Sequence, residues 1–375
     1  MRKLSWVLVI VGLGMVAGWA QPVAPHGSPA ILIDGSSTVA PIVEAVAAEF
    51  AAVRADARIA VGVSGTSGGF RRFLARETDI SNASRPIRGG EITGANAAGI
   101  EYIELLIGLD GIVVAIARQS KIFRPGVAPV LTLGELELLW SREAEGFITR
   151  WSQLGTRFTD APITLSGGSS ASGTFDLWTA QVNRTLGDIR ADYFGTEEDQ
   201  LLAEQTGADP YALTWFGFAF LEHNRDIVQG VAVDNRRVLI DTPSDVVTEI
   251  NRRRVANNKE PLEVVGGTAE GIFPTVDTIG AFLYQPLSRP IFVYVNRESA
   301  RRPMVAAFVD FLLRDDIIGS EEFMLDVGYL PAYATLLEAT RAVWANRKVG
   351  TAFGGVFAGL PADEIIARYR AHAGL

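Results

Sequence analysis

The chain of 375 residues contains no cysteine, and this absence excludes several classes of site. Disulfides, thiolate metal sites and cysteine nucleophiles are ruled out, and so is a lipid-modified cysteine at a mature N-terminus. Histidine is nearly as scarce, because the chain holds only His26, His223 and His372, which lie far apart in the sequence. A metal centre of clustered histidines therefore has no support, and each of the three is interpreted as a surface or capping residue.

Motifs for hydrolysis are missing in the same way. A serine hydrolase needs a general base, and no histidine lies near a G-x-S-x-G elbow in the sequence. The G-x-x-x-x-G-K-[ST] loop of nucleotide hydrolases does not occur. Clustered His and Asp ligands for two catalytic metal ions are absent too. These absences favour a binding protein, with no metal and no cofactor, over an enzyme.

The chain has too few basic residues to suggest a nucleic-acid partner. It carries 34 Lys and Arg against 43 Asp and Glu, for a net charge of −9. A protein of this charge has no overall field that would attract an anion. If the protein binds an anion, local hydrogen-bond donors and cations must provide the attraction.

Residues 1–20 have the pattern of a signal peptide. Arg2 and Lys3 precede an apolar run over 4–16, and small residues before Gln21 suit cleavage there. The alternative is a membrane anchor, for which the run is short. Cleavage would leave a linker over 21–28 and lower the net charge from −9 to −11. We expect a periplasmic or secreted protein that is not a lipoprotein.

Three short loops rich in glycine, serine and threonine each precede a stretch of helical apolar periodicity. They read G-S-S-T-V-A-P from Gly35, G-V-S-G-T-S-G-G-F from Gly62, and G-G-S-S-A-S-G-T-F-D from Gly167. Glycine lets a backbone approach a ligand closely, hydroxyls donate hydrogen bonds, and the N–H groups at a helix N-terminus favour an anion. One such loop is usually only a turn. Three of them indicate convergence on one small oxyanion.

The sequence resembles the periplasmic phosphate-binding proteins of the PstS class. The resemblance lies in the blocks D-G-S-S-T-V, S-G-T-S-G-G-F, T-D-I-S-N-A-S-R-P-I, G-L-D-G-I-V-V, S-G-T-F-D and Y-Q-P-L-S-R-P-I-F-V-Y-V. These blocks extend from Asp34 to Val295, and weaker similarity continues through V-G-Y-L-P at 327–331. Together they cover most of the mature chain.

The resemblance implies an α/β fold of two lobes, the type II-like periplasmic binding protein fold, with the ligand in the cleft between the lobes. The first lobe is expected over 29–108 and again over 287–375, where the second part includes a C-terminal extension. The second lobe is expected over 109–286. Two crossings of the chain between the lobes would permit hinge closure.

The crossing is predicted near Gly108-Leu109-Asp110, between apolar strands at 102–107 and 111–117. Asp110 is open to three interpretations, as a hinge residue, a ligand contact or the cap of a turn. Residues 235–267 are interpreted as a peripheral insertion.

The three loops, together with the resemblance, predict a set of ligand contacts. They are Ser37, Thr38, Ser67, Gly68, Arg85, Ser172, Gly173, Thr174 and Asp176. Arg85 is expected to be the main cation, because a guanidinium offers parallel donors to phosphate oxygens. Asp176 could accept the proton of hydrogen phosphate and so exclude sulfate, or it could only stabilise the start of its helix.

The chain departs from the wider family at two charged positions. Arg85 stands where that pattern has an aspartate, and Gly168 stands where it has an arginine. The identity of the acceptor carboxylate is therefore open. The expected function is capture of inorganic phosphate by a monomer that delivers it to an inner-membrane ABC permease. The alternatives are another tetrahedral oxyanion, such as sulfate, molybdate or tungstate, or hydrolysis of phosphate esters. Transport and sensing are not distinguished.

Overall fold

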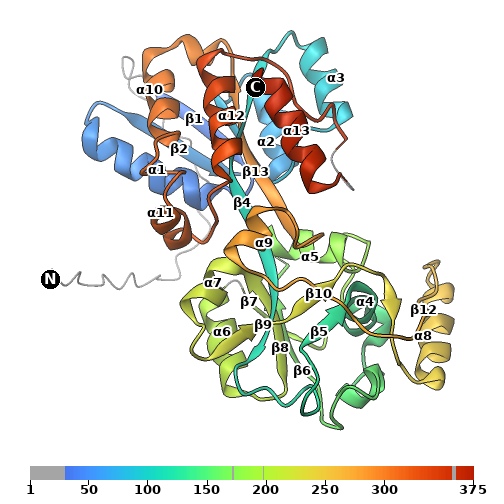
Figure 1. The fold of residues 1–375 in the computed structure, drawn as a ribbon. Coiled ribbons are helices and arrows are strands. Elements are labelled where there is room, and N and C mark those ends of the chain that lie inside the picture. Colours follow the sequence, from blue (N-terminus) through green and yellow to red (C-terminus); the bar gives the residue numbers. More distant parts are fainter. Residues whose placement is uncertain (1–29, 171–172, 197, 357–359) are drawn as a thin grey trace, which may run out of the picture.

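The computed structural model describes residues 30–170, 173–196, 198–356 and 360–375. The predicted signal peptide and linker lie outside this part of the chain. Figure 1 shows two lobes joined by two strands, β4 (Tyr102–Ala117) and β13 (Ser288–Asn296). Among the described residues, no helix has the length and apolar character needed to cross a membrane.

The first lobe, called lobe 1, is built on a mixed sheet. Its strands lie in the order β2 (Arg58–Val63), β1 (Ala30–Gly35), β3 (Ile80–Ala83), β13 and β4. Strand β1 pairs in parallel with both β2 and β3, whereas β13 is antiparallel to β3 and β4. The carboxyl ends of β1, β2 and β3 therefore meet at one edge, where ligands bind in sheets of this kind.

Helices pack around this sheet in Figure 1. They are α1 (Ala40–Val53), α2 (Thr66–Leu74), α3 (Gly89–Ala97), α10 (Pro303–Leu312), α11 (Glu321–Asp326), α12 (Ala334–Ala345) and α13 (Ala362–Ala373), with a 3-10 turn, η3, at Ser299–Arg301. Helix α1 buries Val43, Val46 and Phe50 at the spacing of one helical face. The Phe50 ring meets Phe308 of α10 edge to face, with centroids 5.6 Å apart. The core of lobe 1 thus joins segments far apart in the sequence.

The second lobe, called lobe 2, contains the remaining strands. They are β5 (Val130–Thr132), β6 (Thr164–Gly168), β7 (Phe194–Thr196), β8 (Ala212–Gly217), β9 (Val228–Gly230), β10 (Ala232–Asp234), β11 (Val238–Leu239) and β12 (Glu263–Val264). Strand β8 pairs with β4 and β6, and β6 pairs with β7. Strands β5 and β10 form one small pair, and β11 and β12 another.

The helices of lobe 2 enclose an aromatic core. They are α4 (Leu133–Trp140), α5 (Gly173–Gln181), α6 (Asp199–Ala208), α7 (Phe218–His223), α8 (Ser244–Ala256) and α9 (Val276–Gly280), with 3-10 turns at Arg142–Ala144 (η1) and Trp151–Leu154 (η2). The Trp178 and Trp215 rings stack at 4.9 Å, and Trp140 packs against both edge to face. This cluster anchors α5 on the face of lobe 2 that is turned toward lobe 1 in Figure 1.

The crossing between the lobes differs from the prediction. Instead of two strands separated at Gly108–Asp110, one strand of 16 residues, β4, runs through both lobes with every residue buried. The glycines there mark close packing and no turn: a Cβ on Gly108 would lie 2.6 Å from the Met324 Cε, and one on Gly111 would lie 2.9 Å from the Ile279 Cδ1. The sheets of the lobes are therefore continuous through β4, and the division at 108/109 remains a prediction.

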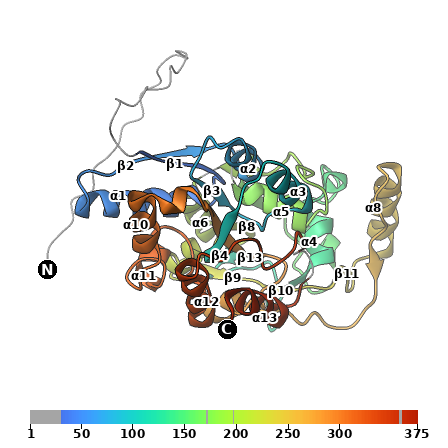
Figure 2. The ribbon, with the colours of Figure 1, turned by 90° about the horizontal axis from the view of Figure 1, so that it is seen from above.

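Residues 235–267 lie mainly at the outer side of lobe 2. Figure 2 shows α8 standing apart from the other helices, at the end of the molecule remote from α1. The segment is nevertheless tied to the lobe, because the buried Arg254 donates to Glu137 of α4 at 2.6 Å.

Candidate functional site

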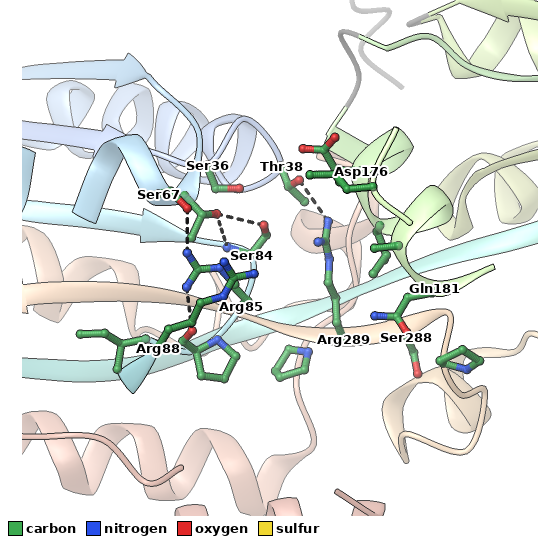
Figure 3. Close-up of a pocket in the computed structure, with 18 of the residues that line it drawn as sticks. Ser36, Thr38, Ser67, Ser84, Arg85, Arg88, Asp176, Gln181, Ser288 and Arg289 are labelled. Atoms are coloured by element: carbon green, nitrogen blue, oxygen red, sulfur yellow. Dashed lines mark hydrogen bonds between the residues drawn. The ribbon is translucent and has the colours of Figure 1, made fainter. Parts of the chain in front are cut away.

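A cleft of about 1140 Å³ lies between the two lobes. Its walls include the residues after β1, β2 and β3 in lobe 1 and one face of α5 in lobe 2. The cleft contains six of the nine predicted contacts, namely Ser37, Thr38, Ser67, Gly68, Arg85 and Asp176. Figure 3 shows the side chains of Ser67, Arg85, Thr38 and Asp176 in one view. Residues from loops more than a hundred positions apart therefore face one cavity.

Two local features fix the first two loops next to each other. The backbone of Gly35 has φ of 146°, and a Cβ there would lie 2.2 Å from the carbonyl oxygen of Asn82 in β3. Only glycine fits this position. The buried Asp34 accepts a 2.6 Å hydrogen bond from the Ser64 hydroxyl and forms an ion pair with Arg72 of α2. The end of β1 thus orients the loop that follows β2.

Helices α1 and α2 begin at the cleft without side-chain caps. Neither Val39, the N-cap residue of α1, nor Gly65, that of α2, makes a side-chain cap hydrogen bond. The first N–H groups of a helix have no partner within the helix, and the helix dipole makes this end positive. Because residues before and within the first turn of α2, including Ser67 and Gly68, line the cleft, its N–H groups suit an anion there.

Arg85 lies at the cleft with four hydrogen bonds already formed. Its guanidinium makes two bonds of 2.8 Å to the Glu91 carboxylate, one of 2.9 Å to the Ser67 hydroxyl oxygen and one of 3.1 Å to the Pro86 carbonyl. The Arg85 charge is thus balanced by Glu91, which the sequence interpretation did not include. Because the Ser67 oxygen accepts from Arg85, the Ser67 hydroxyl hydrogen is left to donate to another group.

Arg289 repeats this arrangement on the other side of the cleft. It forms an ion pair of 2.9 Å with the buried Asp110 and donates at 3.2 Å to the Thr38 hydroxyl oxygen. Figure 3 shows its guanidinium extended toward Thr38. Asp110 lies within β4 and pairs with an arginine of β13, so it does not cap a turn, and its role at the hinge or toward the ligand remains a prediction. Burial, together with the charge of Asp110, raises the pKa of the nearby Asp199 to about 6.

The third loop is described only in part. Ser172 lies outside the described residues, and Gly173 and Thr174 are the first two residues of α5. Of the predicted contacts on α5, Asp176 is among the described lining residues, whereas Gly173 and Thr174 are not. Asp176 is the only carboxylate among those lining residues. The roles of all four remain predictions.

A cluster of charges supports the wall of the cleft in lobe 2. Arg237 lines the cleft and donates to the carbonyl of Val182 at 2.9 Å, just beyond the end of α5. It shares the buried Glu137 carboxylate with Arg184 and Arg254, at 3.2, 3.1 and 2.6 Å. Burial lowers the pKa of the Arg237 guanidinium, and the two neighbouring arginines lower it further. One carboxylate thus faces three guanidinium groups.

A buried network lies behind the loop that carries Arg85. The backbone N–H of Ile87 donates to the Tyr294 hydroxyl at 2.8 Å, and this hydroxyl donates to Glu104 at 2.7 Å. The other Glu104 oxygen accepts from the N–H of Ala352 at 3.0 Å. Burial raises the pKa of Glu104 to about 7. The network therefore connects the third strand end of lobe 1 to the C-terminal segment through one titratable group.

Gly65–Gly69 fits the letters of a G-x-S-x-G elbow with Ser67 at its centre. The sequence therefore contains this motif, and the argument against hydrolysis rests on the lack of a base beside Ser67. Among the described residues that line the cleft there is no histidine, and the Ser67 oxygen accepts from a cation. A serine nucleophile must instead lose its proton to a neighbouring base.

Comparison with known proteins places the chain in a family. A model of the PBP superfamily domain matches residues 22–316, and the chain belongs to this superfamily. The chain is 33% identical to Protein SphX of Synechocystis over 356 residues, which cover 95% of this chain and 94% of that protein. It is 28% identical to the phosphate-binding protein PstS of Staphylococcus epidermidis over 298 residues, 79% of this chain and 77% of that one.

Solved structures agree with this assignment. A possible phosphate binding protein from Planctomyces limnophilus is 31% identical, covers 85% of this chain and 98% of its own, and gives a TM-score of 0.66. An ABC-type phosphate transport receptor from Vibrio cholerae, with a TM-score of 0.57 over 80% of this chain and 99% of its own, shares the fold at 17% identity. The predicted family resemblance and the two-lobed α/β fold are confirmed, and these relatives are binding proteins rather than enzymes.

Proposed function

We propose that this protein captures inorganic phosphate between its two lobes and delivers it to an ABC permease. The observation that carries the proposal is the meeting of two uncapped helix N-termini, their hydroxyl-rich loops and two oriented hydroxyls in one cleft. Such donors stabilise an oxyanion without a net positive protein charge. The phosphate-binding names of the relatives support the same ligand.

In this proposal the donors come from three loops. The contacts are Ser37 and Thr38 before α1, Ser67 and Gly68 in α2, and Ser172, Gly173 and Thr174 at the start of α5. Arg85 and Arg289 hold the Ser67 and Thr38 oxygens as acceptors, so the hydrogens of both hydroxyls are directed to the ligand. Arg85 also retains its Nε–H group, which none of the four bonds uses.

Selection against sulfate requires an acceptor. Hydrogen phosphate carries a proton at neutral pH and sulfate does not, so a carboxylate at the site accepts from the first and repels the second. Thr38 and Ser67 are already committed as donors, and Asp176 is the only carboxylate among the described lining residues. We therefore assign the acceptor role to Asp176.

The ligand is far smaller than the cleft. A volume of about 1140 Å³ exceeds the 300 to 1000 Å³ or so of sites that bury drug-sized molecules. In this proposal the lobes close about β4 and β13, so that one phosphate contacts both α2 and α5. In this proposal lobe 1 comprises 29–108 and 287–375, and lobe 2 comprises 109–286.

The remaining parts of the proposal concern location and partners. The N-terminal pattern over 1–20 exports the chain, which then works as a monomer in the periplasm or outside the cell and has no nucleic-acid partner. The permease receives phosphate from the closed form. The name of the phosphate-binding protein PstS supports the phosphate ligand in this proposal.

Isothermal titration calorimetry of the purified mature chain tests the proposal. Phosphate should bind with one site per chain, and sulfate, molybdate and tungstate should compete poorly. Thr38→Val and Ser67→Ala should each weaken binding, because a hydrogen bond to a charged group contributes about 1.5 to 3 kcal/mol. Tighter binding of sulfate or molybdate than of phosphate would mean that phosphate is not the natural ligand. No heat with any of the four anions would reject an oxyanion-binding function.

A further inference from the structure

The cleft is rich in arginine, although the protein as a whole is acidic. Its described lining includes Arg71, Arg85, Arg88, Arg237 and Arg289, against one carboxylate. Three of these five have acidic partners, since Arg85 pairs with Glu91, Arg237 with Glu137 and Arg289 with Asp110. These three are structural or positioning residues of the walls.

The other two arginines have no such partner. Among the described residues, no hydrogen bond or ion pair is made by the guanidinium of Arg71 or of Arg88, and both residues are exposed. Arg71 lies on the first turns of α2, where its Nη2 is 3.7 Å from the position of a Cβ on Gly68. Arg88 precedes α3 and lies beside Arg85 in Figure 3. Both charges therefore flank the proposed phosphate loops on the solvent side.

The opposite wall adds charge of the same sign. Glu137 alone faces the guanidinium groups of Arg184, Arg237 and Arg254, so this cluster has an excess of positive charge. Lobe 1 contributes Arg71 and Arg88 to the cleft, and lobe 2 contributes Arg237, the member of this cluster that lines it, together with the Asp176 carboxylate. A phosphate ion that approaches the open cleft thus meets more arginines than carboxylates among the described lining residues, within a protein whose net charge of −9 repels it elsewhere.

We infer that Arg71 and Arg88 are steering residues that accelerate the entry of phosphate into the cleft. The inference rests on the proposed phosphate-binding function and adds the kinetics of that site. Charges at the mouth of a cleft raise the local concentration of an oppositely charged ligand and its association rate, by about 10- to 1000-fold in strong cases. Removing rim charges changes the association rate and its salt dependence more than the dissociation rate.

Rapid-mixing kinetics tests this inference. The chain lacks cysteine, so Leu186→Cys, a 66% exposed position at the cleft, accepts a single environment-sensitive fluorophore. Association and dissociation rates for inorganic phosphate are measured in this background and in the same background carrying Arg71→Gln and Arg88→Gln. The ionic strength is varied from about 0.01 to 0.5 M, which shortens the Debye length from about 30 Å to a few Å.

A matched control separates local steering from overall charge. Arg58 and Arg301 are exposed residues of lobe 1 that are not among the residues lining the cleft. Arg58 begins β2 and therefore lies at the edge of the sheet opposite the loops, and Arg301 lies beside Asn296, the last residue of β13, at the same edge. The double variant Arg58→Gln with Arg301→Gln removes the same number of positive charges, two, but far from the cleft.

We expect the cleft variant to lose about 5- to 10-fold in association rate at low salt and less than about 2-fold at 0.5 M, with dissociation nearly unchanged. The control variant should associate at the starting rate at every salt concentration. An equal loss in the control would overturn the inference, as would an unchanged association rate or a loss confined to faster dissociation, which would make these arginines direct ligands. A starting protein that binds no phosphate would instead reject the proposed function.

Discussion

Arg85→Ala should weaken phosphate binding mainly because it leaves Glu91 without a counter-charge. The two side chains are 20% and 17% exposed, so each is largely removed from water. Bonds of 2.8 and 2.9 Å from the same Nη2 atom place the Glu91 and Ser67 oxygens less than about 6 Å apart. A phosphate that accepts from Ser67 would then lie within about 8 or 9 Å of the unpaired carboxylate.

The size of the effect follows from this distance. At an effective dielectric constant of about 20, two unit charges 8 Å apart repel by about 2 kcal/mol before screening by salt. Loss of the bond that orients the Ser67 hydroxyl adds about 1 kcal/mol. Together these effects predict a loss of affinity of at least about 10-fold for Arg85→Ala, since 1.4 kcal/mol corresponds to a factor of ten.

The double variant Arg85→Ala with Glu91→Gln separates repulsion from direct contact. If Glu91 is the cause, neutralising it should restore most of the lost affinity, as measured by calorimetry at constant ionic strength. Glu91→Gln alone should bind phosphate at least as tightly as the unaltered chain. If the double variant is as weak as Arg85→Ala, Arg85 contacts the ligand directly and the electrostatic reasoning is refuted.

Three further results are expected. Asp176→Asn should lower the ratio of phosphate to sulfate affinity in competition binding, and an unchanged ratio together with a stability loss of about 0.3 to 1 kcal/mol would leave Asp176 with only a helix-supporting role. Glu104 has a folded-state pKa of about 7 against an ordinary 4.5, so its contribution to stability is full below pH 4.5 and is lost as pH rises through 7. In urea unfolding, the free energy of unfolding of the unaltered chain should therefore fall by about 3 kcal/mol between pH 4.5 and 7, and that of Glu104→Gln should not show this fall. The same pH dependence of the free energy of unfolding in both proteins would contradict the raised pKa of Glu104. Arg289→Ala should lower the free energy of unfolding by about 3 kcal/mol, because the carboxylate of the buried Asp110 loses its partner. Adding Asp110→Asn to that variant should recover stability in thermal unfolding, and no recovery would mean that Arg289 acts mainly through packing.

Much of the fold was predictable because its signals are local. The apolar runs at β1 and β2, each followed by a glycine-rich loop and an amphipathic stretch, indicated parallel pairing and a site at the carboxyl ends. The break between two strands at the crossing was predicted wrongly because Gly108 and Gly111 have the composition of a turn. The reason that glycine is needed at these two positions is nonlocal, since Met324 and Ile279 occupy the space that a Cβ would need.

The predicted site missed the partners of its charged residues for a similar reason. Arg289 lies in the block Y-Q-P-L-S-R-P-I-F-V-Y-V, which pointed to the family, but its contact with Thr38 joins residues 251 positions apart. Glu91 follows Arg85 by six residues, a spacing that no periodic pattern marks, and the pairing depends on the turn before α3. Contacts made through tertiary structure of this kind have no signal in one sequence.

A crystal structure of the mature chain grown with phosphate tests the central claim most directly. The account predicts one phosphate in the cleft, held by the loops before α1 and α2 together with the start of α5, with the lobes closer than they are here. It also predicts that the Asp176 carboxylate lies within hydrogen-bond distance of a phosphate oxygen. A phosphate bound to one lobe alone, or bound outside the cleft, would contradict the account.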